Sequence, residues 1–351
     1  MLLYSIVVLW PLIIKYIYNN FYYNENLKRN NKTLFILFAI LPMLSLIAFR
    51  NIYLGPDTGT YIANFISIRD GSLKTVLEDS RMEDGYLYFV KGVTYLTQSP
   101  EMFQVIYTSI YAIAIVILMQ EFEDNCFDFL FFFGTLGLYM FMFTGVRQCL
   151  AMSICIIAYR FAVRRKFVGF IIFVFIAYNL HSSAALFLVV YFVIRLKIRW
   201  YNIFVYIIGA LLVTAYIKQI QGIFNDAWDL SYSVEETGNG GIFFVYLLLL
   251  VVVSSFLLYQ SNNIEKCKYL MNLSIITVVF WALRLVTRVA ERPSYYFMFF
   301  LCALVPYAIN SVKDKDRTVY QLLIYGTAFL LFIYRLNTNF SLLTPYKTFW
   351  G

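Results

Sequence analysis

The sequence predicts an all-α protein that crosses a membrane many times, and two observations support this fold class. Of the 351 residues, 61% are hydrophobic and only 14% are charged, which gives a mean hydropathy of +0.71. The apolar residues also form runs long enough for helices that cross a bilayer core, which is about 30 Å thick and takes roughly 20 residues. An ordinary soluble domain has neither property, so lipid is the expected solvent.

We expect about twelve transmembrane helices, one for each apolar run. In chain order they cover residues 2–18, 33–49, 103–119, 128–145, 149–163, 167–179, 183–195, 201–217, 241–259, 269–288, 294–311 and 319–335. The first run lacks a small-residue cleavage site and continues into a polar segment, which favours a retained anchor helix over a signal peptide. No repeat or linker divides the chain, so residues 1–351 are expected to form a single integral membrane domain.

The charged residues predict an orientation for these helices. Sixteen of the 28 lysines and arginines lie in alternate short loops, which places those loops inside and the N-terminus outside. The larger outer segments are then residues 50–102, residues 218–240 and the tail 336–351. Within the first of these, residues 57–102 alternate charged with aromatic residues, and we expect them to form interfacial or re-entrant amphipathic helices.

Several classes of function find no support in the sequence. The net charge of +8 is not gathered into one basic domain, so no nucleic-acid partner is expected. The five cysteines show no paired spacing, and the chain has one histidine, so we expect no disulfide framework and no metal site. Neither a phosphate-binding glycine-rich loop with lysine nor a Ser-His-Asp order occurs, and no cofactor is expected.

Arginines at the outer ends of the expected helices are the first candidates for function. Burying a guanidinium in hydrocarbon costs several kcal/mol, so arginines at this depth normally face a polar cavity. The planar guanidinium fits phosphate oxygens, which makes a diphosphate the expected ligand. The alternative is that the side chains extend to the lipid headgroups and have no further role. The set comprises Arg50, Arg147, Arg284, Arg288 and Arg292.

The segment WALRLVTRVAERPSYYF holds three of these arginines and a carboxylate. Arg284, Arg288 and Glu291 are spaced i, i+4 and i+7, which predicts that they lie on one face of one helix. Pro293 is expected to interrupt that helix, with Arg292 in an extended conformation before it. The four charged residues then form either a cradle for a diphosphate or a ladder of self-paired charges.

Two further candidates lie at short outer turns. The segment FTGVRQCLAM places Arg147 and Gln148 between the fourth and fifth helices, and His181 lies between the sixth and seventh. Counting the crossings puts all three on the same side of the membrane. A single histidine beside apolar residues is most often structural, and Gln148 is equally suited to a helix cap or an interhelical hydrogen bond.

The segment AFRNIYLGPDTGTYIANF contains a Gly-Pro turn followed by Asp57, which is well placed to cap a helix that begins at Thr58. The same carboxylate could hold Arg50 or a sugar hydroxyl in position. The tail segment SLLTPYKTFW adds Lys347 beside an aromatic cluster, whose alternative role is to anchor the chain in the membrane interface.

A group of arginines with one histidine suits the transfer of a sugar from a lipid-linked diphosphate. The arginines would stabilise the departing diphosphate electrostatically. A histidine, with an ordinary pKa of about 6.5, would take a proton from the incoming hydroxyl.

Five motifs occur in order along nearly the whole chain: RNIYLGPDTGTY at 50–61, VRQCLA at 146–151, LHSSA at 180–184, RPSYYF at 292–297 and TPYKTF at 344–349. In this ordered set the chain resembles the Wzy/EpsG-type polysaccharide polymerases. These are polytopic glycosyltransferases that join undecaprenyl-diphosphate-linked oligosaccharide repeat units outside the plasma membrane. Pro56 departs from the pattern, because a small polar residue would be expected between the glycine and the aspartate.

The resemblance implies a GT-C-like bundle with an outward-facing cavity. It implicates catalytic roles for His181, Arg147 and Asp57, whereas Arg284 and Arg288 depend on the helical-face argument alone. The expected substrate-binding residues are Arg50, Tyr61, Gln148, Arg284, Arg288, Glu291, Arg292, Tyr296 and Lys347.

The expected function is therefore polymerisation of O-antigen or capsule-type repeats at the cell inner membrane, with the active site facing the periplasm or exterior. The expected partners are undecaprenyl-diphosphate-linked oligosaccharides, membrane lipids and, as a further candidate, a chain-length regulator protein. Two alternatives stay open: a transporter or flippase of the same lipid-linked sugar, and an O-antigen ligase.

Overall fold

The computed structural model describes residues 1–21, 25–55, 57–71, 73–80, 82–197, 240–338 and 343–350. Over these ranges the chain is predominantly helical and contains no β-strand, which confirms the all-α class. The chain divides into two compact units: Met1–Ala185 with Thr327–Gly351, and Leu186–Gly326. Whether both belong to one integral membrane domain stays a prediction.

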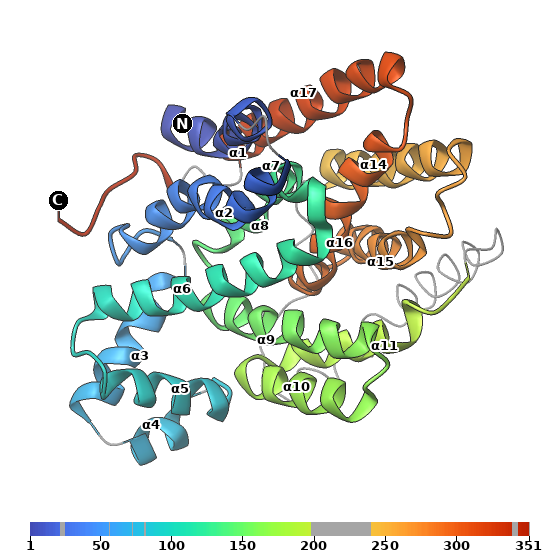
Figure 1. Ribbon diagram of the computed structural model, residues 1–351. Coiled ribbons are helices and arrows are strands. Elements are labelled where there is room, and N and C mark those ends of the chain that lie inside the picture. The colour runs from blue at the N-terminus through green and yellow to red at the C-terminus, as the bar shows by residue number, and fades with distance from the viewer. Residues whose placement is uncertain are drawn as a thin grey trace. The chain divides into compact units, whose positions relative to one another are not determined.

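The first unit opens with the long helices α1 (Leu2–Phe21) and α2 (Glu25–Ala48), followed by the shorter helices α3 (Thr58–Asp70), α4 (Leu73–Asp79) and α5 (Asp84–Thr94) (Figure 1). It continues with α6 (Pro100–Met119), the 3₁₀ segment η1 (Gln120–Asn125), α7 (Cys126–Thr135), α8 (Leu138–Phe141), α9 (Val146–Val163) and α10 (Phe167–Leu180). The end of α17 (Asp314–Thr338) and the tail complete it.

The start of α6 shows how local sequence fixes a helix boundary in this unit. Ser99 caps the helix, because its side chain accepts a hydrogen bond from the backbone N–H of Met102 at 3.2 Å. Pro100 occupies the first helical position, where a backbone N–H is not needed. From this start α6 runs against both α2 and α9.

The expected helix 128–145 is broken in two, between α7 and α8. Gly137 has φ +100°, in the left-handed region that favours glycine, and a Cβ there would lie 2.9 Å from a guanidinium nitrogen of Arg335. The surrounding sequence is apolar without interruption, so hydropathy alone gave no sign of the break. The prediction of one continuous span at this place is therefore wrong.

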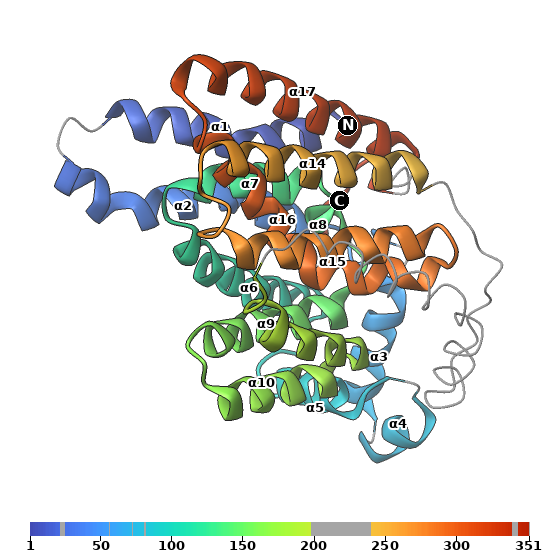
Figure 2. The same ribbon diagram turned by 90° about the vertical axis from the view of Figure 1, so that its right-hand side faces the viewer.

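The segment after α2 is helical, as expected for residues 57–102, and its helices share a core with α6 and α9. The rings of Phe65 on α3 and Phe103 on α6 are stacked with centroids 5.0 Å apart, and Tyr86 of α5 is fully buried beside them. Helix α5 also contacts α10, and the two lie side by side in both views (Figures 1 and 2). This packing positions the start of α5 near the end of α10.

The C-terminal tail pairs with the chain just after α2. The backbone N–H of Asn51 donates to the carbonyl of Lys347 at 2.8 Å, and that of Phe349 donates to the carbonyl of Phe49 at 3.2 Å. Around these bonds Arg50 and Thr348 form an isolated antiparallel bridge. The first and last parts of this unit are therefore joined directly.

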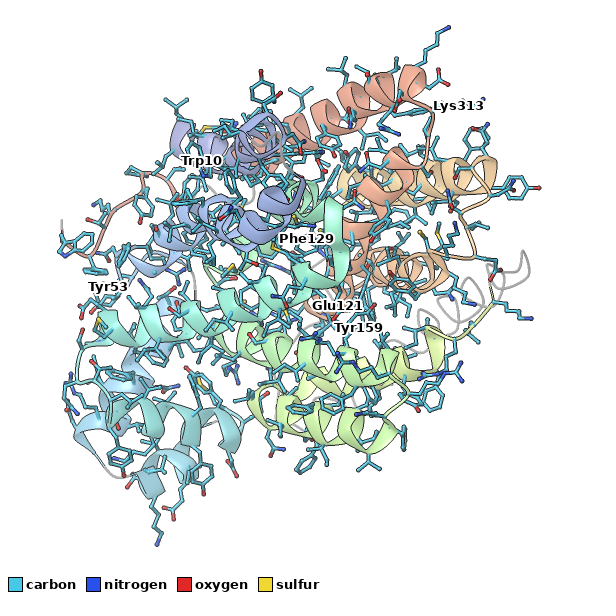
Figure 3. All side chains as sticks on the ribbon, in the orientation of Figure 1. Trp10, Tyr53, Glu121, Phe129, Tyr159 and Lys313 are labelled. Carbon is cyan, nitrogen blue, oxygen red and sulfur yellow. The ribbon has the colours of Figure 1, made fainter. Side chains whose placement is uncertain are left out.

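An ion pair closes the far end of α9. Arg160 contacts Glu121 of η1 at 2.8 Å, and Figure 3 shows Glu121 close to Tyr159, the neighbour of Arg160. With an α-helical rise of about 1.5 Å per residue, this pair lies roughly 20 Å along α9 from Arg147.

The second unit contains the second half of η2 (Ser182–Val189), α11 (Val190–Val193), α14 (Gly241–Gln260), α15 (Lys268–Arg284), η3 (Arg288–Ala290), α16 (Glu291–Asn310) and the first part of α17. Helices α14, α15 and α16 contact one another. Their packing is aromatic, because Phe243 meets Trp281 edge-on at 4.5 Å and Phe280 stacks on Phe297 at 5.7 Å.

Six helices of the described chain are long and apolar enough to cross a membrane, so the expected count of about twelve is not confirmed. They are Leu2–Asn20, Asn31–Ala48, Pro100–Phe122, Val146–Val163, Gly241–Gln260 and Asp314–Thr338. The segment expected at 183–195 is largely 3₁₀ helix followed by a short α-helix, and α10 is shorter than a full span. The expected helix 201–217 and, apart from Gly240, the expected outer loop 218–240 lie outside the described residues.

Candidate functional site

One carboxylate joins two of the predicted site residues. In Glu83, Oε1 lies 3.0 Å from Nδ1 of His181 and accepts the backbone N–H of Ser182 at 2.8 Å. Its other oxygen, Oε2, accepts a hydrogen bond from Nη1 of Arg147 at 2.5 Å. Arg147 and His181 were predicted from the sequence, whereas Glu83, which lies 98 residues before His181, was not.

Each member of this Glu83–Arg147–His181 cluster lies at a helix end. Glu83 immediately precedes α5, Arg147 is the second residue of α9, and His181 directly follows α10 with an extended backbone. Arg147 therefore belongs to the first turn of a helix and not to the turn before it. The helix ends meet because Gly85 allows close packing: a Cβ there would lie 2.5 Å from the carbonyl oxygen of Asn179 on α10.

The cluster is mostly buried but still reaches the surface. The side chains of Glu83, Arg147 and His181 are 19%, 18% and 13% exposed. The guanidinium carbon of Arg147 lies 6.0 Å from the ring centroid of Tyr61, which is itself buried. In the described structure Nε of Arg147 is buried without a hydrogen-bond partner. The guanidinium thus has one donor that no described group of the protein accepts.

Glu83 is ionised at neutral pH. Burial by itself would raise the pKa of this carboxyl. The hydrogen bond with His181, the charges of His181 and Arg147 and the backbone N–H of Ser182 together outweigh burial, and they lower the pKa of Glu83 to about 2. The cluster therefore combines a fixed anion, a permanent cation and an imidazole. Such a set can bind an anionic group and move a proton beside it.

Arg50 lies in a different environment, although the sequence placed it in the same group as Arg147. Its side chain is fully buried and donates to the carbonyl of Met142 at 3.3 Å and to the hydroxyls of Thr58 at 3.4 Å and Tyr107 at 3.0 Å. Its guanidinium lies 5.0 Å from the ring centroid of Phe143. These partners all belong to the protein, so Arg50 supports the loop after α2 from inside.

Asp57 precedes α3, as predicted, but its side chain makes no capping hydrogen bond. No ion pair links it to Arg50 within the described residues, so the structure gives no support to the expectation that this carboxylate holds that arginine. Asp57 is partly exposed, and its neighbour Pro56 lies outside the described residues.

The helical-face prediction for Arg284, Arg288 and Glu291 is wrong. Helix α15 ends at Arg284, Thr287 is extended, and α16 begins at Glu291, so no single helix carries all three residues. Pro293 does not interrupt a helix either, since it is the third residue of α16, in the first turn, where a backbone N–H has no intrahelical partner.

The charged residues of this segment still meet across the break between the helices. Nε of Arg284 donates to Oε2 of Glu291 at 2.9 Å, and the hydroxyl of Tyr295 donates to Oε1 of Glu291 at 2.9 Å. Arg284 is buried, Arg288 is exposed and Arg292 is partly buried. These residues belong to the second unit, so a pocket that unites all five arginines with His181 stays a prediction.

The remaining predicted residues lie in varied surroundings. Gln148 is buried in the first turn of α9, and Tyr296 is fully buried on α16, with its ring centroid 6.4 Å from that of Phe187. Lys347 is exposed, and its backbone carbonyl accepts from Asn51. Among the described residues, no three histidine, cysteine, aspartate or glutamate side chains are arranged to hold a metal ion.

Over the described residues, the helical fold with six membrane-length apolar helices fits a membrane protein. The charged cluster at the helix ends has the chemistry to bind an anion and to move a proton. The sequence profile of the EpsG family matches residues 32–348, so the chain belongs to the EpsG family, whose members are Wzy-type polysaccharide polymerases. The predicted resemblance is confirmed. No curated protein and no solved structure shows significant similarity to the chain, and the GT-C-like bundle stays a prediction.

Proposed function

We propose that this protein polymerises undecaprenyl-diphosphate-linked oligosaccharide repeat units into O-antigen or capsule-type polysaccharide on the outer side of the inner membrane. Membership of the EpsG family supports a polysaccharide polymerase. The structural observation that carries the proposal is the pairing of His181 and Arg147 through one carboxylate. A proton acceptor and a diphosphate-binding cation are the two groups that this transfer needs.

The growing lipid-linked chain is the donor, and a new lipid-linked unit is the acceptor. The acceptor hydroxyl oxygen forms a bond with the anomeric carbon of the donor. The bond between that carbon and the diphosphate oxygen breaks, and its electron pair leaves with undecaprenyl diphosphate. The hydroxyl proton moves to Nε2 of His181, which acts as general base.

Arg147 stabilises the diphosphate as negative charge develops on it. Glu83 holds Nη1 of Arg147, which fixes the plane of the guanidinium, while Nε is a donor without an acceptor among the described residues. A donor held in place before the reaction stabilises the transition state by about 3 kcal/mol without reorganising during the step. The guanidinium lies over the ring of Tyr61, which restrains it further.

The other predicted residues take supporting or substrate-binding roles in this proposal. Arg50 holds the loop that leads to Asp57, and Asp57 is partly exposed and suited to contact a sugar hydroxyl. Proposed contacts of the lipid-linked substrates are Gln148, Arg284, Arg288, Glu291, Arg292, Tyr296 and Lys347.

The first test is the variant His181→Ala expressed in a strain that lacks the wild-type gene. Without the imidazole, surface glycan should stop at one repeat unit, and the gel ladder of longer chains should disappear. Lys74→Ala is a matched control, because Lys74 lies in the same unit with a side chain that is 86% exposed. A normal ladder from His181→Ala, at equal membrane abundance, would remove the imidazole from the mechanism.

The second test separates the polymerase from the two alternatives. Purified protein in vesicles is supplied with lipid-linked repeat units, and both product length and movement across the bilayer are measured. Longer lipid-linked products support the polymerase. Movement without elongation would identify a flippase, and transfer only to a lipopolysaccharide core acceptor would identify a ligase.

A further inference from the structure

We propose that Glu83 is a positioning residue that holds His181 in the tautomer with hydrogen on Nδ1, so that Nε2 carries the lone pair that accepts the proton. The inference rests on the proposed glycosyl transfer for its catalytic meaning. The tautomer itself is a property of the resting protein and can be measured without any substrate.

Hydrogen-bond chemistry at Glu83 leaves one assignment for the proton. An ionised carboxylate has only acceptor atoms. Oε1 already accepts the backbone N–H of Ser182 at 2.8 Å, and Nδ1 of His181 lies 3.0 Å from the same oxygen. Nδ1 must therefore be the donor. In neutral imidazole the other nitrogen, Nε2, then has no hydrogen and carries a lone pair.

This tautomer has to be selected by the protein, because imidazole side chains in water favour hydrogen on Nε2. If His181 kept that form here, the lone pair of Nδ1 would face the lone pairs of Oε1. The two atoms would repel each other in a mostly buried site where water cannot separate them. Glu83 removes this conflict by favouring the hydrogen on Nδ1, and the lone pair of the imidazole then lies on Nε2.

Glu83 is itself held in place, as a positioning residue must be. Oε2 accepts a charged hydrogen bond from Arg147 at 2.5 Å, and Oε1 accepts from the backbone at Ser182. The close contact of Gly85 with Asn179 fixes the start of α5 against the end of α10. The carboxylate therefore cannot rotate away from His181 without breaking both hydrogen bonds at once.

The same contact helps His181 after it has accepted the proton. The imidazolium that forms carries a positive charge beside the ionised Glu83, while Arg147 is occupied on the other carboxylate oxygen. Attraction between imidazolium and carboxylate lowers the free energy of the protonated state. Glu83 thus orients the base and stabilises its product without touching the substrate.

The chain allows a direct measurement of the tautomer, because His181 is its only histidine. Protein labelled with ¹⁵N-histidine and purified through an affinity tag without histidine gives the nitrogen signals of one imidazole. At neutral pH we expect a protonated Nδ1 and an unprotonated Nε2 in the wild type. In Glu83→Gln the hydrogen should move to Nε2, at least in part of the molecules.

The matched control for this measurement is Glu121→Gln. Glu121 also pairs with an arginine of α9, Arg160 at 2.8 Å, but at the opposite end of that helix. This variant should keep the wild-type imidazole signals. A wild-type spectrum with hydrogen on Nε2, or with both nitrogens protonated at neutral pH, would overturn the proposal. An unchanged tautomer in Glu83→Gln would overturn it as well.

Elongation kinetics then test whether the tautomer matters for the reaction. Glu83→Gln should lower kcat by about a hundredfold or more while KM stays within about twofold, because the base and not the binding is affected. In the background of His181→Ala, the same substitution should lower the rate much less than in the wild type, because only its effect through Arg147 remains. An equal loss with and without the imidazole would show that Glu83 acts through the fold or through Arg147, and would overturn the inference.

The two proposals fail in different ways. Wild-type elongation by His181→Ala would reject the general base and leave the measured tautomer as a structural property. Loss of activity in His181→Ala with full activity in Glu83→Gln would reject the positioning role alone.

Discussion

Arg147 and Arg50 are both arginines at helix ends of the same unit, yet the structure gives them opposite surroundings. Arg147 pairs with the carboxylate of Glu83, lies beside His181 and is 18% exposed. Arg50 is fully buried, and within the described part of the chain its side chain donates to a carbonyl and two hydroxyls. The first arrangement leaves a cation able to meet a ligand, and the second uses the cation to hold protein groups together.

The difference shows that residue type and depth do not decide the role of an arginine. Their expected position at the outer ends of helices grouped Arg50 with Arg147 as binders of a diphosphate. Burial without a carboxylate partner instead makes Arg50 sensitive to any change in its neighbours, because a lost partner leaves a buried charge poorly compensated. We therefore expect changes at Arg50 to act on stability and changes at Arg147 to act on the reaction.

The largest expected effect is that of Arg50→Ala on stability. Removal of the guanidinium leaves a cavity and deprives Met142, Thr58 and Tyr107 of a donor, so the free energy of unfolding should fall by about 3 kcal/mol. Thermal unfolding in detergent measures the change. Loss of polymer should then follow the loss of folded protein. A variant with wild-type stability and no activity would place Arg50 in the reaction and erase the contrast with Arg147.

The next effect is that of Arg147→Ala on elongation. The rate should fall by about a hundredfold, because one preorganised donor to the diphosphate is lost. Membrane abundance should stay near that of Arg160→Ala, which breaks the other arginine–glutamate pair of α9 and serves as the control. Similar rates for these two variants would show that Arg147 is only a structural partner of Glu83.

A smaller effect concerns the pH dependence of stability. The pKa of Glu83 is lowered from an ordinary 4.5 to about 2, so its contribution to stability is complete above pH 4.5 and is lost as the pH falls toward 2. Between pH 7 and pH 3 the wild type should lose more stability than Glu83→Gln. Unfolding curves of both proteins measure this difference. Parallel curves would mean that the carboxylate is not held by Arg147 and His181 in solution.

The smallest effect is expected for Tyr107→Phe, which removes one hydroxyl from Arg50. This hydroxyl accepts from Nη2 of Arg50 at 3.0 Å, and its loss should reduce the free energy of unfolding by about 1.5 kcal/mol. Tyr95→Phe, at a side chain that is largely exposed, should have no measurable effect. In the Arg50→Ala background the loss from Tyr107→Phe should be smaller, because the two residues share one interaction.

The fold class could be predicted from the sequence because composition and long apolar runs are averages that do not depend on local detail. The number of spanning helices could not be predicted in the same way. At Gly137 a left-handed residue ends a helix inside a continuous apolar run, and hydropathy does not register backbone conformation. The glycine itself was the available signal.

The candidate site could be predicted only in part from the sequence, for a different reason. Arg147 and His181 stand out because charged and titratable groups are rare in apolar segments. Glu83 lies in the polar run MEDGY, where carboxylates are common, and tertiary packing alone brings it to His181. The sequence signal for Glu83 was its place shortly before the apolar residues Tyr86, Leu87 and Val90, which is the position of a carboxylate at the start of a helix.

The prediction that Arg284, Arg288 and Glu291 share one helical face was wrong, because ideal helical spacing applies only inside one helix. The chain leaves the helix after Arg284, and Thr287 is extended. Arg284 and Glu291 still pair, so the spacing identified a true contact for an incorrect reason.

The bridge between Thr348 and Arg50 sets the order in which the protein can be completed during synthesis. The hydroxyl of Tyr346 bonds to the carbonyl of Leu46, 300 residues earlier, and Tyr4 reaches Leu343 over 339 residues. The ribosome must therefore make nearly the whole chain, including every residue of the second unit, before the loop around Arg50 gains its last neighbours. Until the tail is made, the backbone on either side of Arg50 lacks the hydrogen bonds that Lys347 and Phe349 supply.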